Sequence, residues 1–418
     1  MRLHVAVLLI AIALAPASAS SQSPEEIAGK AIELLSPVDS YRNAAIDYFA
    51  RRGKPDAAPA LILALRFSPD GKRLAAALEL DGFDSPIRLG LIGAGAVVQV
   101  AHLPVLRRLK AVNLIALCDT DLPKARALAE RSNIPNVYDD IEDLLQHESL
   151  DAVLIATPNH LHESHLQAAL AAGLHVLIEK PIALASAGAQ KAIRSAEKRG
   201  KVVMVGMTHR YRPDVQAVRS FVQAGELGQI NSVRASWHLA RSARTSLGWR
   251  EKRSESGGGA MFDLGITMLD LGFWLAGNPT PSRVSASLSR GATERAVEQS
   301  GSAMMICKNG AAIFIDVTWR HIGAGERFGA GIRGAKGSAG INPLHVWKEI
   351  HGMPHDVSPT GSGSRDTAFV ASFKAQWAHF LAAAAGRVAP PSLEEQAQVL
   401  RVLEAIYKSD ADGRDVLL

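Results

Sequence analysis

The architecture of this chain follows from residues 87–98, which read Ile87-Arg-Leu-Gly-Leu-Ile-Gly93-Ala-Gly95-Ala-Val-Val98. An apolar run of strand length meets a glycine-rich turn, and helical apolar spacing begins directly after it. Gly93 permits the tight turn, and Gly95 lets a phosphate group approach closely. The N–H groups of Ala96 and Val97 then open a helix whose dipole favours an anion. The stretch therefore predicts a strand, a dinucleotide-binding turn and a helix.

The residues after this turn repeat the alternation of strand and helix. Apolar runs of strand length lie at 87–92, 112–118, 151–156, 174–178 and 201–206, and helical stretches lie near 98–110, 121–131, 162–172 and 186–199. Gly173 and Gly200 follow the last two helical stretches, as helix-ending glycines do. Repeated βα units of this kind predict an α/β fold with a parallel, doubly wound sheet.

The choice of cofactor depends on Asp119, at the end of the second apolar run. An acid at this place accepts hydrogen bonds from the ribose hydroxyls of NAD, which supports a motif whose third glycine is replaced by Val98. A loop aspartate that caps the helix from Asp121 is the alternative interpretation. An enzyme for NADP more often has a basic or small polar residue there. Arg126 is near in sequence, so NAD is preferred while NADP stays possible.

A lysine ends a later strand, in the segment Gly173-Leu-His-Val-Leu-Ile-Glu179-Lys180-Pro181. Ligands bind at the carboxyl ends of the strands in open α/β sheets. A partly desolvated ammonium at such a place acts as a proton donor or stabilises an oxyanion. A solvated lysine that merely ends the strand is the competing interpretation of Lys180.

Two regions precede the α/β pattern. Residues 1–19 fit a secretory signal peptide, with Arg2 before a short apolar stretch and Ala17-Ser18-Ala19 as the cleavage site. This predicts an exported, periplasmic protein with no membrane span in the mature chain, whereas a mis-assigned start would make it cytoplasmic. Residues 20–86 fit a helical preface that resembles a HEAT-type helix pair.

Composition and charge exclude some classes of partner. The 418 residues include 46 Lys and Arg against 41 Asp and Glu, a net charge of +5. Nucleic-acid binding needs a basic face with interleaved aromatic residues, so the basic patch at 234–253 is better interpreted as a solvated loop or a contact to an anionic substrate. Cys118 and Cys307 lie far apart in apolar runs, so no disulfide framework or metal site is expected.

Three segments, taken together, are more specific than any single motif. They are Ala156-Thr-Pro-Asn159-His-Leu-His162, then Glu179-Lys180-Pro181, and later Gly257-Gly-Gly-Ala-Met-Phe-Asp263-Leu-Gly-Ile-Thr267-Met-Leu-Asp270. Their order and spacing closely resemble the glucose–fructose oxidoreductase / inositol dehydrogenase / rhizopine-catabolism (Gfo/Idh/MocA) family. The resemblance extends from Ile87 to Leu418 and leaves residues 1–86 uncovered.

The resemblance implies an NAD(P)-binding Rossmann domain at 87–212 and a C-terminal substrate and oligomerisation α/β domain at 213–418. The second domain is expected to contain a largely antiparallel open sheet. Its expected strands are Val284–Leu288, Ser302–Cys307 and Ala311–Trp319, and the helices Ala368–Ala385 and Leu393–Lys408 are expected to pack on it. The face of such a sheet commonly mediates oligomerisation, so a homo-oligomer (dimer or tetramer) is expected.

The resemblance also implies roles for individual residues. Those expected along the cofactor are Thr157, Pro158, Asn159 and His162, together with Glu179 and Lys180, which bridge cofactor and substrate. Arg210 and Tyr211, in the segment that links the domains, are expected to contact substrate together with Trp249. Because His162 belongs to this motif, the cluster of His160, His162 and His165 needs no metal.

One departure from the family concerns the proton. In the family, Asp263 is followed four residues later by a histidine that serves as acid and base for the reacting hydroxyl, and here that residue is Thr267. Positions i and i+4 share one helical face, so both side chains are expected to point into the cleft. A threonine hydroxyl is a poor base near neutral pH. Lys180 is therefore expected to carry more of the proton chemistry, with Asp263 and Thr267 as its catalytic neighbours.

Three functions follow from these patterns. The first is an NAD(P)-dependent oxidoreductase that transfers a hydride between a sugar, cyclitol or related polyol and the nicotinamide. The second is redox-assisted elimination or glycoside cleavage with tightly held NAD. The third, motivated by Thr267, is a non-catalytic dinucleotide or sugar-binding protein.

Overall fold

The computed structural model describes residues 86–240, 248–290, 297–359 and 366–418. The predicted signal peptide and all but the last residue of the predicted helical preface lie outside the described residues. Among the residues described, no helix is long and apolar enough to cross a membrane.

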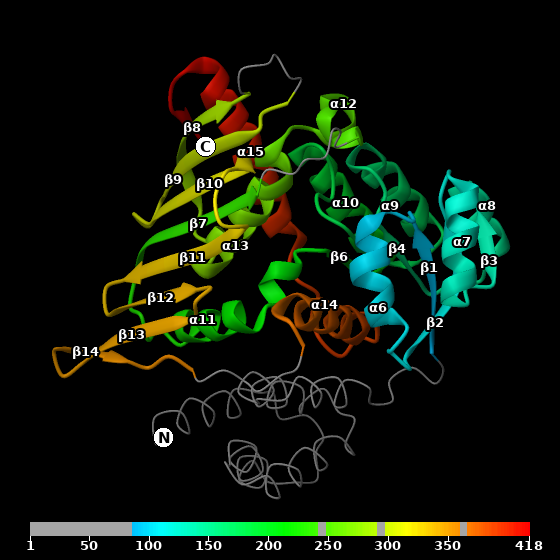
Figure 1. The fold of residues 1–418 in the computed structure, drawn as a ribbon, viewed down its shortest axis with the longest axis horizontal. Helices are drawn as coiled ribbons and strands as arrows, with labels where there is room; N and C mark the ends of the chain where they lie inside the picture. Colours follow the sequence, from blue (N-terminus) through cyan, green and yellow to red (C-terminus); the bar gives the residue numbers. More distant parts are fainter. Residues whose placement is uncertain (1–85, 241–247, 291–296, 360–365) are drawn as a thin grey trace, which may run out of the picture.

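The first domain is built on a six-stranded parallel sheet with the order β3-β2-β1-β4-β5-β6 (Figure 1). Its strands are β1 (Ile87–Ile92), β2 (Val112–Cys118), β3 (Asn136–Tyr138), β4 (Ala152–Ile155), β5 (His175–Ile178) and β6 (Val203–Val205). The order of the strands reverses between β1 and β4, and ligands bind at the carboxyl ends of the strands at such a switch point. The sheet therefore provides a crevice directly beside the glycine-rich turn.

Helices cover both faces of this sheet (Figure 1). One face packs against α8 (Ile141–His147), α9 (His162–Ala171) and α10 (Ser186–Arg199). The other face packs against η2 (Val98–His102), α6 (Leu103–Leu106) and α7 (Leu122–Ser132). Burial on both faces explains why the strands read as continuous apolar runs in the sequence.

The second domain is built on a nine-stranded sheet with the order β14-β13-β12-β11-β7-β10-β9-β8-β15. Its strands are β7 (Ile230–Ala240), β8 (Pro281–Ser289), β9 (Ser300–Cys307), β10 (Ala312–His321), β11 (Arg327–Gly334), β12 (Gly337–Ile341), β13 (His345–Ile350), β14 (Met353–Asp356) and β15 (Val416–Leu417). In the described part of the chain, β7 and β10 run parallel and the other neighbours in this sheet run antiparallel. The predicted fold class, a doubly wound parallel sheet followed by a largely antiparallel one, is confirmed.

Further helices join the two sheets. They are η3 (Asn159–Leu161), η4 (Thr208–Tyr211), α11 (Pro213–Gln223), η5 (Gly248–Glu251), α12 (Arg253–Ser256), η6 (Met261–Gly265), α13 (Ile266–Leu275), α14 (Ala368–Ala384) and α15 (Leu393–Asp412). Helices α11, α13 and α15 contact the nine-stranded sheet, and α15 also packs on α10 of the first domain. The expectation that the last helix packs on the second sheet is therefore confirmed.

The structure corrects the packing predicted for the other C-terminal helix. Instead of lying on the nine-stranded sheet, α14 places Phe373, Trp377 and Phe380 in one buried cluster with Leu91 and Leu154 of the first sheet. It also contacts η2, α6 and η4. The reason is steric: η2, α6 and α7 leave part of this apolar face uncovered, and the aromatic side of α14 fills it. The C-terminal sequence thus completes the core of the N-terminal sheet.

We expect a Trp377→Ala substitution to lower the free energy of unfolding by about 3–5 kcal/mol, because it empties the space of a fully buried ring. Phe369 on the same helix is 50% exposed, so Phe369→Ala should cost much less. Urea unfolding followed by circular dichroism measures both losses. Equal losses would contradict the placement of α14 in the core of the first domain.

Candidate functional site

The glycine-rich turn is shaped to receive a dinucleotide. Gly93 has φ +104°, and a Cβ there would lie 2.6 Å from the backbone oxygen of Ala156, so this turn requires glycine. At Gly95 the nearest atom to an added Cβ is 4.0 Å away, so this glycine faces open space rather than protein. Ala96 is exposed and Val97 half-buried in the first turn of the following helix. Room for a phosphate and helix N–H groups thus coincide, which fits a bound dinucleotide.

Asp119 stands at the carboxyl end of β2, beside this turn. Its carboxylate accepts hydrogen bonds from the Ala94 N–H at 2.7 Å and the Asp121 N–H at 2.9 Å, and it pairs with the Lys124 ammonium at 2.9 Å. Burial acts to raise the pKa of Asp119, but Lys124 and the two amides outweigh it and hold the pKa below its ordinary value. The carboxylate is therefore ionised and can accept hydrogen bonds from the ribose hydroxyls of a dinucleotide. The helix cap is Asp121 instead, which accepts from the Lys124 N–H.

The Thr157-Pro158-Asn159 loop after β4 reaches the second domain. The side-chain amide of Asn159 donates to the Ser256 carbonyl at 2.8 Å, and the Thr157 hydroxyl lies 3.1 Å from His165 Nδ1. His162, predicted to bind cofactor, is 1% exposed and lies between two carbonyls: Nδ1 is 2.6 Å from the Pro181 oxygen and Nε2 is 2.8 Å from the Thr157 oxygen. His162 therefore links the loop after β4 to the loop that contains Lys180, and its ring is not accessible to a bound cofactor.

A chain of buried side chains orients Glu179. The Trp377 indole N–H donates to His102 Nδ1 at 3.0 Å, so the proton of the neutral ring is on Nε2. That Nε2 donates to Glu179 Oε1 at 2.9 Å. Burial acts to raise the pKa of Glu179, but the hydrogen bond from His102 and the nearby Lys180 keep it below its ordinary value. The carboxylate next to the lysine is thus held ionised by a helix from the C-terminal region.

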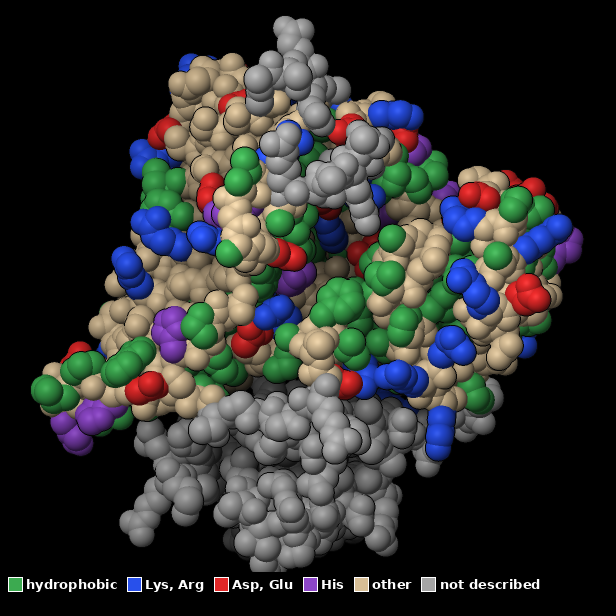
Figure 2. Space-filling model, in the orientation of Figure 1, with side chains coloured by type: hydrophobic (Ala, Val, Ile, Leu, Met, Phe, Trp, Pro, Cys, Tyr) green, Lys and Arg blue, Asp and Glu red, His purple; other side chains and the backbone are tan. Residues whose placement is uncertain are grey.

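Lys180 and Asp263 meet across the two domains. The Lys180 ammonium donates to Asp263 Oδ1 at 2.8 Å and to the Asp263 backbone carbonyl at 2.6 Å. The other carboxylate oxygen, Oδ2, accepts from the Trp319 indole N–H at 3.2 Å. The two charged side chains are 23% and 26% exposed, so solvent reaches the pair. Figure 2 shows basic and acidic side chains inside a hollow between the two domains.

The surroundings of Asp263 form a small cleft. It is lined by Asn159, Trp249, Arg250, Ser256, Gly258, Asp263 and Trp319. The Arg250 guanidinium stacks on the Trp249 ring, 4.4 Å from its centroid. Burial acts to raise the pKa of Asp263, but Lys180 and then Arg250 outweigh it and hold the pKa below its ordinary value. The predicted substrate residue Trp249 therefore lies beside the predicted catalytic pair.

The geometry around Thr267 differs from the helical argument made from the sequence. Asp263 belongs to η6, a π-helical turn, whereas Thr267 lies in the α-helix α13 that follows. The wider turn of a π-helix alters the angle between positions four apart. Thr267 is 4% exposed, while Asp263 is open to the cleft. The shared face expected for these two residues therefore does not follow from their spacing.

A different histidine, His209, is affected by the charge of Lys180. Its ring packs against Trp237 and Phe328, with centroids 4.9 Å and 4.8 Å away. Burial, followed by Arg212 and Lys180, lowers the pKa of His209 to about 3. With this pKa the ring is neutral near neutral pH and is a weaker base than an ordinary imidazole.

Arg210 and Tyr211 were predicted to contact substrate, and the structure does not support that role. The Arg210 guanidinium is 5% exposed; its Nε donates to Asp270 at 2.7 Å, and it also pairs with Glu395. The Tyr211 hydroxyl lies 3.1 Å from Nδ1 of His379 on α14. Both side chains have their polar atoms engaged in joining η4 to C-terminal helices, which leaves them a structural role.

Several site residues were missed by sequence reasoning. Trp319 ends a strand that was predicted, but no motif marks its indole as a partner of Asp263. His102 and Ser256 contact Glu179 and Asn159 across 77 and 97 residues of chain. Contacts over such separations leave no spacing signal in a single sequence.

Comparison with known proteins assigns both domains. A model described as "Oxidoreductase family, NAD-binding Rossmann fold" matches residues 87–207, and the Gfo/Idh/MocA C-terminal domain model matches residues 215–340. The chain is 30% identical over 283 residues to D-glucoside 3-dehydrogenase of Escherichia coli (strain K12), covering 64% of this chain and 80% of that enzyme. It is 28% identical over 338 residues to D-apiose dehydrogenase of Paraburkholderia graminis, covering 78% and 88%.

A solved structure has the same overall fold. The crystal structure of GenD2 from gentamicin A biosynthesis in complex with NAD superposes with a TM-score of 0.70 and 25% identity, covering 80% of this chain and 97% of that one.

We expect Gly93→Ala to affect mainly the stability of the fold and Gly95→Ala to affect mainly the binding of NAD. Gly93→Ala should lower the free energy of unfolding by about 2 kcal/mol or more, because of its positive φ and the contact with Ala156. Gly95→Ala should leave stability nearly unchanged and weaken NAD binding by about tenfold or more, because the added methyl group occupies the open space. Thermal unfolding and calorimetric titration with NAD separate the two. Undiminished NAD affinity in Gly95→Ala would contradict the placement of the dinucleotide.

Proposed function

Because the chain belongs to the Gfo/Idh/MocA oxidoreductase family, we propose that it transfers a hydride between NAD and a hydroxyl-bearing carbon of a sugar, cyclitol or related polyol. The residues of the Rossmann crevice fit the cofactor: Gly93 and Gly95 would leave room for its phosphates, and Asp119 would accept hydrogen bonds from its ribose. When bound, NAD supplies the nicotinamide carbon that takes or returns the hydride.

The observation that carries the proposal is the set of hydrogen bonds that the Lys180 ammonium makes. An ammonium has three N–H donors, and two of them are directed to Asp263, one to its carboxylate and one to its carbonyl. One donor is left for a substrate oxygen. Lys180 follows β5 at the carboxyl edge of the sheet, the edge at which ligands bind in open α/β sheets, and this position supports the proposal.

The proton chemistry follows from this pair. Oxidation of a secondary alcohol removes a hydride from carbon and a proton from oxygen, and leaves a carbonyl. In the oxidation direction Lys180 acts as the neutral amine, after it has released one proton to the solvent that reaches the pair. Its two N–H groups remain directed to Asp263, and its lone pair accepts the hydroxyl proton as the hydride leaves the carbon. Asp263 stabilises the resulting ammonium and keeps its Nζ in place. In the reverse direction the same lysine returns the proton to the carbonyl oxygen.

The substrate class rests on the relatives and on the cleft. The enzymes named above act on a glucoside and on apiose, both carbohydrates. Trp249 and Trp319 supply aromatic surface to the cleft beside Asp263, and Asn159 supplies a polar edge. Ligand sites commonly combine apolar walls with a few placed polar groups in this way.

A non-catalytic dinucleotide or sugar-binding protein is the second candidate function. It is favoured by Thr267, which is 4% exposed and stands in place of the family's histidine. Bound NAD without turnover of any carbohydrate would support it. Turnover without net release of NADH would instead support redox-assisted cleavage with a retained cofactor.

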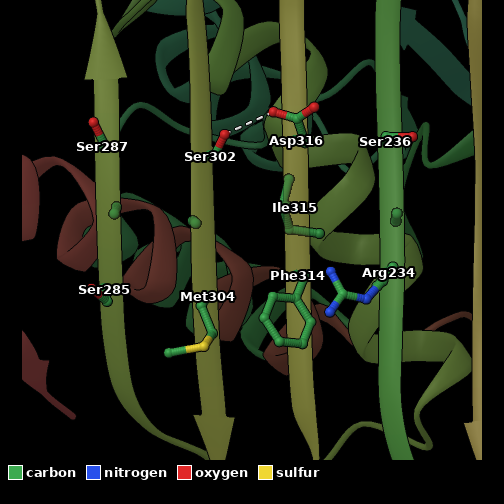
Figure 3. Close-up of a pocket in the computed structure, with 12 residues that line it drawn as sticks. Arg234, Ser236, Ser285, Ser287, Ser302, Met304, Phe314, Ile315 and Asp316 are labelled. Atoms are coloured by element: carbon green, nitrogen blue, oxygen red, sulfur yellow. Dashed lines mark hydrogen bonds between the residues drawn. The ribbon is translucent and has the colours of Figure 1, made fainter.

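A second copy of this chain is the partner proposed for the open face of the nine-stranded sheet. Figure 3 looks onto this face, where strands β8, β9, β10 and β7 line a shallow hollow of about 560 Å³. The Arg234 guanidinium lies over the Phe314 ring at 4.1 Å, and Asp316 accepts from the Ser302 hydroxyl at 2.7 Å. The face carries a cation, Arg234, and an anion, Asp316, on the neighbouring strands β7 and β10. Two copies related by a twofold axis can therefore present opposite charges to each other.

We expect Lys180→Met to bind NAD with native affinity and to lose carbohydrate oxidation, with kcat lower by about 10²–10⁴-fold. The methionine keeps the length of the side chain but removes the donor to the substrate oxygen. Activity is measured by NADH absorbance with a panel of hexoses, glycosides and cyclitols, and NAD binding by calorimetry. Lys191→Met is the matched control, because Lys191 pairs with Glu163 at 2.9 Å on the surface. Native turnover in Lys180→Met would rule out the role assigned to this lysine.

We expect Phe314→Glu to convert the native oligomer to a monomer, because it places a buried negative charge at the centre of the proposed interface. Light scattering coupled to size-exclusion chromatography measures the mass. Met353→Glu, on the exposed edge strand β14, serves as the control and should keep the native mass. A native protein that is already monomeric, or an unchanged mass in Phe314→Glu, would contradict this interface.

A further inference from the structure

We propose that Glu298, together with Tyr407, is a positioning residue for the Lys180–Asp263 pair. These two residues hold the turn at 257–261 from which Asp263 is presented to Lys180. The inference rests on the function proposed above, because it assigns the residues that hold the two members of that catalytic pair in position.

Glu298 is a buried carboxylate, and one of its oxygens accepts three hydrogen bonds. It is 1% exposed and lies just before β9. Its Oε1 accepts hydrogen bonds from the N–H groups of Gly259 and Met261, each at 2.9 Å, and from the Tyr407 hydroxyl at 2.8 Å. Its backbone oxygen accepts from the Ala260 N–H at 2.9 Å. A buried carboxylate is tolerated only with such partners, so the turn and Glu298 stabilise each other.

Tyr407 is suited to remain a donor in this arrangement. Burial and the adjacent Glu298 carboxylate raise the pKa of Tyr407, so its hydroxyl stays protonated through the physiological range. Tyr407 is on α15, the helix that packs on both β8 and α10. The turn is therefore anchored to a helix that contacts both domains.

The glycines of this turn are explained by the same contacts. A Cβ at Gly258 would overlap the Tyr407 hydroxyl, and a Cβ at Gly259 would overlap the backbone oxygen of Glu298. Both glycines are thus required because the Tyr407 phenol and the main chain of Glu298 approach the backbone of the turn closely. Tyr407 and Glu298 thus account for Gly258 and Gly259, whereas Gly257 has φ +88° and its added Cβ would meet the Phe262 ring at 2.6 Å.

The turn lies between a contact to the cofactor loop and the residue that binds Lys180. At its start, the Ser256 carbonyl accepts from Asn159 of the cofactor loop. At its end, Met261 begins η6, and Asp263 two residues later binds Lys180 through both its carboxylate and its carbonyl. A shift of the turn would move both acceptors of the lysine together. Misplacement by about 1 Å costs about 10²-fold in rate at such sites.

The test compares Glu298→Gln and Tyr407→Phe with a matched pair at the edge strand β3, which the strands β2, β1 and β4 separate from the strand that precedes Lys180. Tyr138 donates to Glu148 at 2.9 Å in the first domain, so Tyr138→Phe and Glu148→Gln make the same chemical changes elsewhere. The Tyr138 main-chain carbonyl accepts from the Asp119 N–H, and neither control variant removes that bond. We expect Glu298→Gln to lower kcat about tenfold or more, Tyr407→Phe to lower it less, and NAD affinity to be retained in both. The two control variants should keep the native kcat.

The pH profile separates positioning from general destabilisation. Lys180 and Arg250 hold the pKa of Asp263 below its ordinary value, so loosening the pair moves that pKa upward. The acid limb of kcat/KM should therefore shift to higher pH in Glu298→Gln and, by less, in Tyr407→Phe. A variant that merely unfolds more easily keeps the native limb and loses active protein only.

A second readout does not need turnover. The Trp319 indole N–H donates to Asp263, so its signal in a spectrum of ¹⁵N-tryptophan-labelled protein reports on this carboxylate. Trp319→Phe assigns the signal among the six tryptophans. The signal should move in Glu298→Gln and Tyr407→Phe and stay in place in the controls.

The outcomes distinguish this inference from the proposed function. Unchanged kcat, acid limb and Trp319 signal in a folded Glu298→Gln would overturn it. If Glu298→Gln does not fold, the same three measurements on Tyr407→Phe, which keeps the carboxylate, decide the matter. A native protein without turnover would remove the proposed function, while a shifted Trp319 signal would still show that Glu298 positions Asp263.

Discussion

The hydrogen bonds between the Lys180 ammonium and Asp263 join the two sheets at the site. Lys180 comes from the end of a parallel strand, and Asp263 comes from a π-helical turn beside the antiparallel sheet. The ion pair is partly open to solvent, so its contribution to stability is small. Its value is geometric, because two of the three ammonium donors are fixed and the remaining donor has a defined direction. Much of the surrounding structure preserves this geometry.

The neighbouring polar groups are held from regions remote in the chain. Trp377 of α14 orients His102, which in turn orients Glu179 next to the lysine. Arg210 joins η4 to α13 and α15 through a buried network with Asp270 and Glu395. A buried network of this kind with unpaired polar groups would lower the stability of the fold. These contacts together explain why helices from the C-terminal half pack on both domains.

Predictability from the sequence differs between the two domains. Five of the six strands of the parallel sheet, all except β3, were placed to within two residues at each end, because burial on both faces makes them continuous apolar runs. The short elements β3 and α8, the strand β7 and the strands β11 to β15 were not predicted. In the second sheet one face is open, so polar residues and glycines alternate with apolar ones and the pattern weakens. The packing of α14 was assigned wrongly, because an apolar helix does not encode which sheet it covers.

The sequence by itself determined the strand–turn–helix unit with Gly93 and Gly95, the acid Asp119, the family and the pairing candidates Lys180 and Asp263. Local spacing and chain order carry that information, because backbone geometry converts them directly into position. Only the tertiary structure decided that Arg210 is structural, that Trp319 binds Asp263, and that Glu298 and Tyr407 surround the glycine turn. These contacts join residues from separate elements, and their partners are chosen by packing of the whole chain rather than by distance along it.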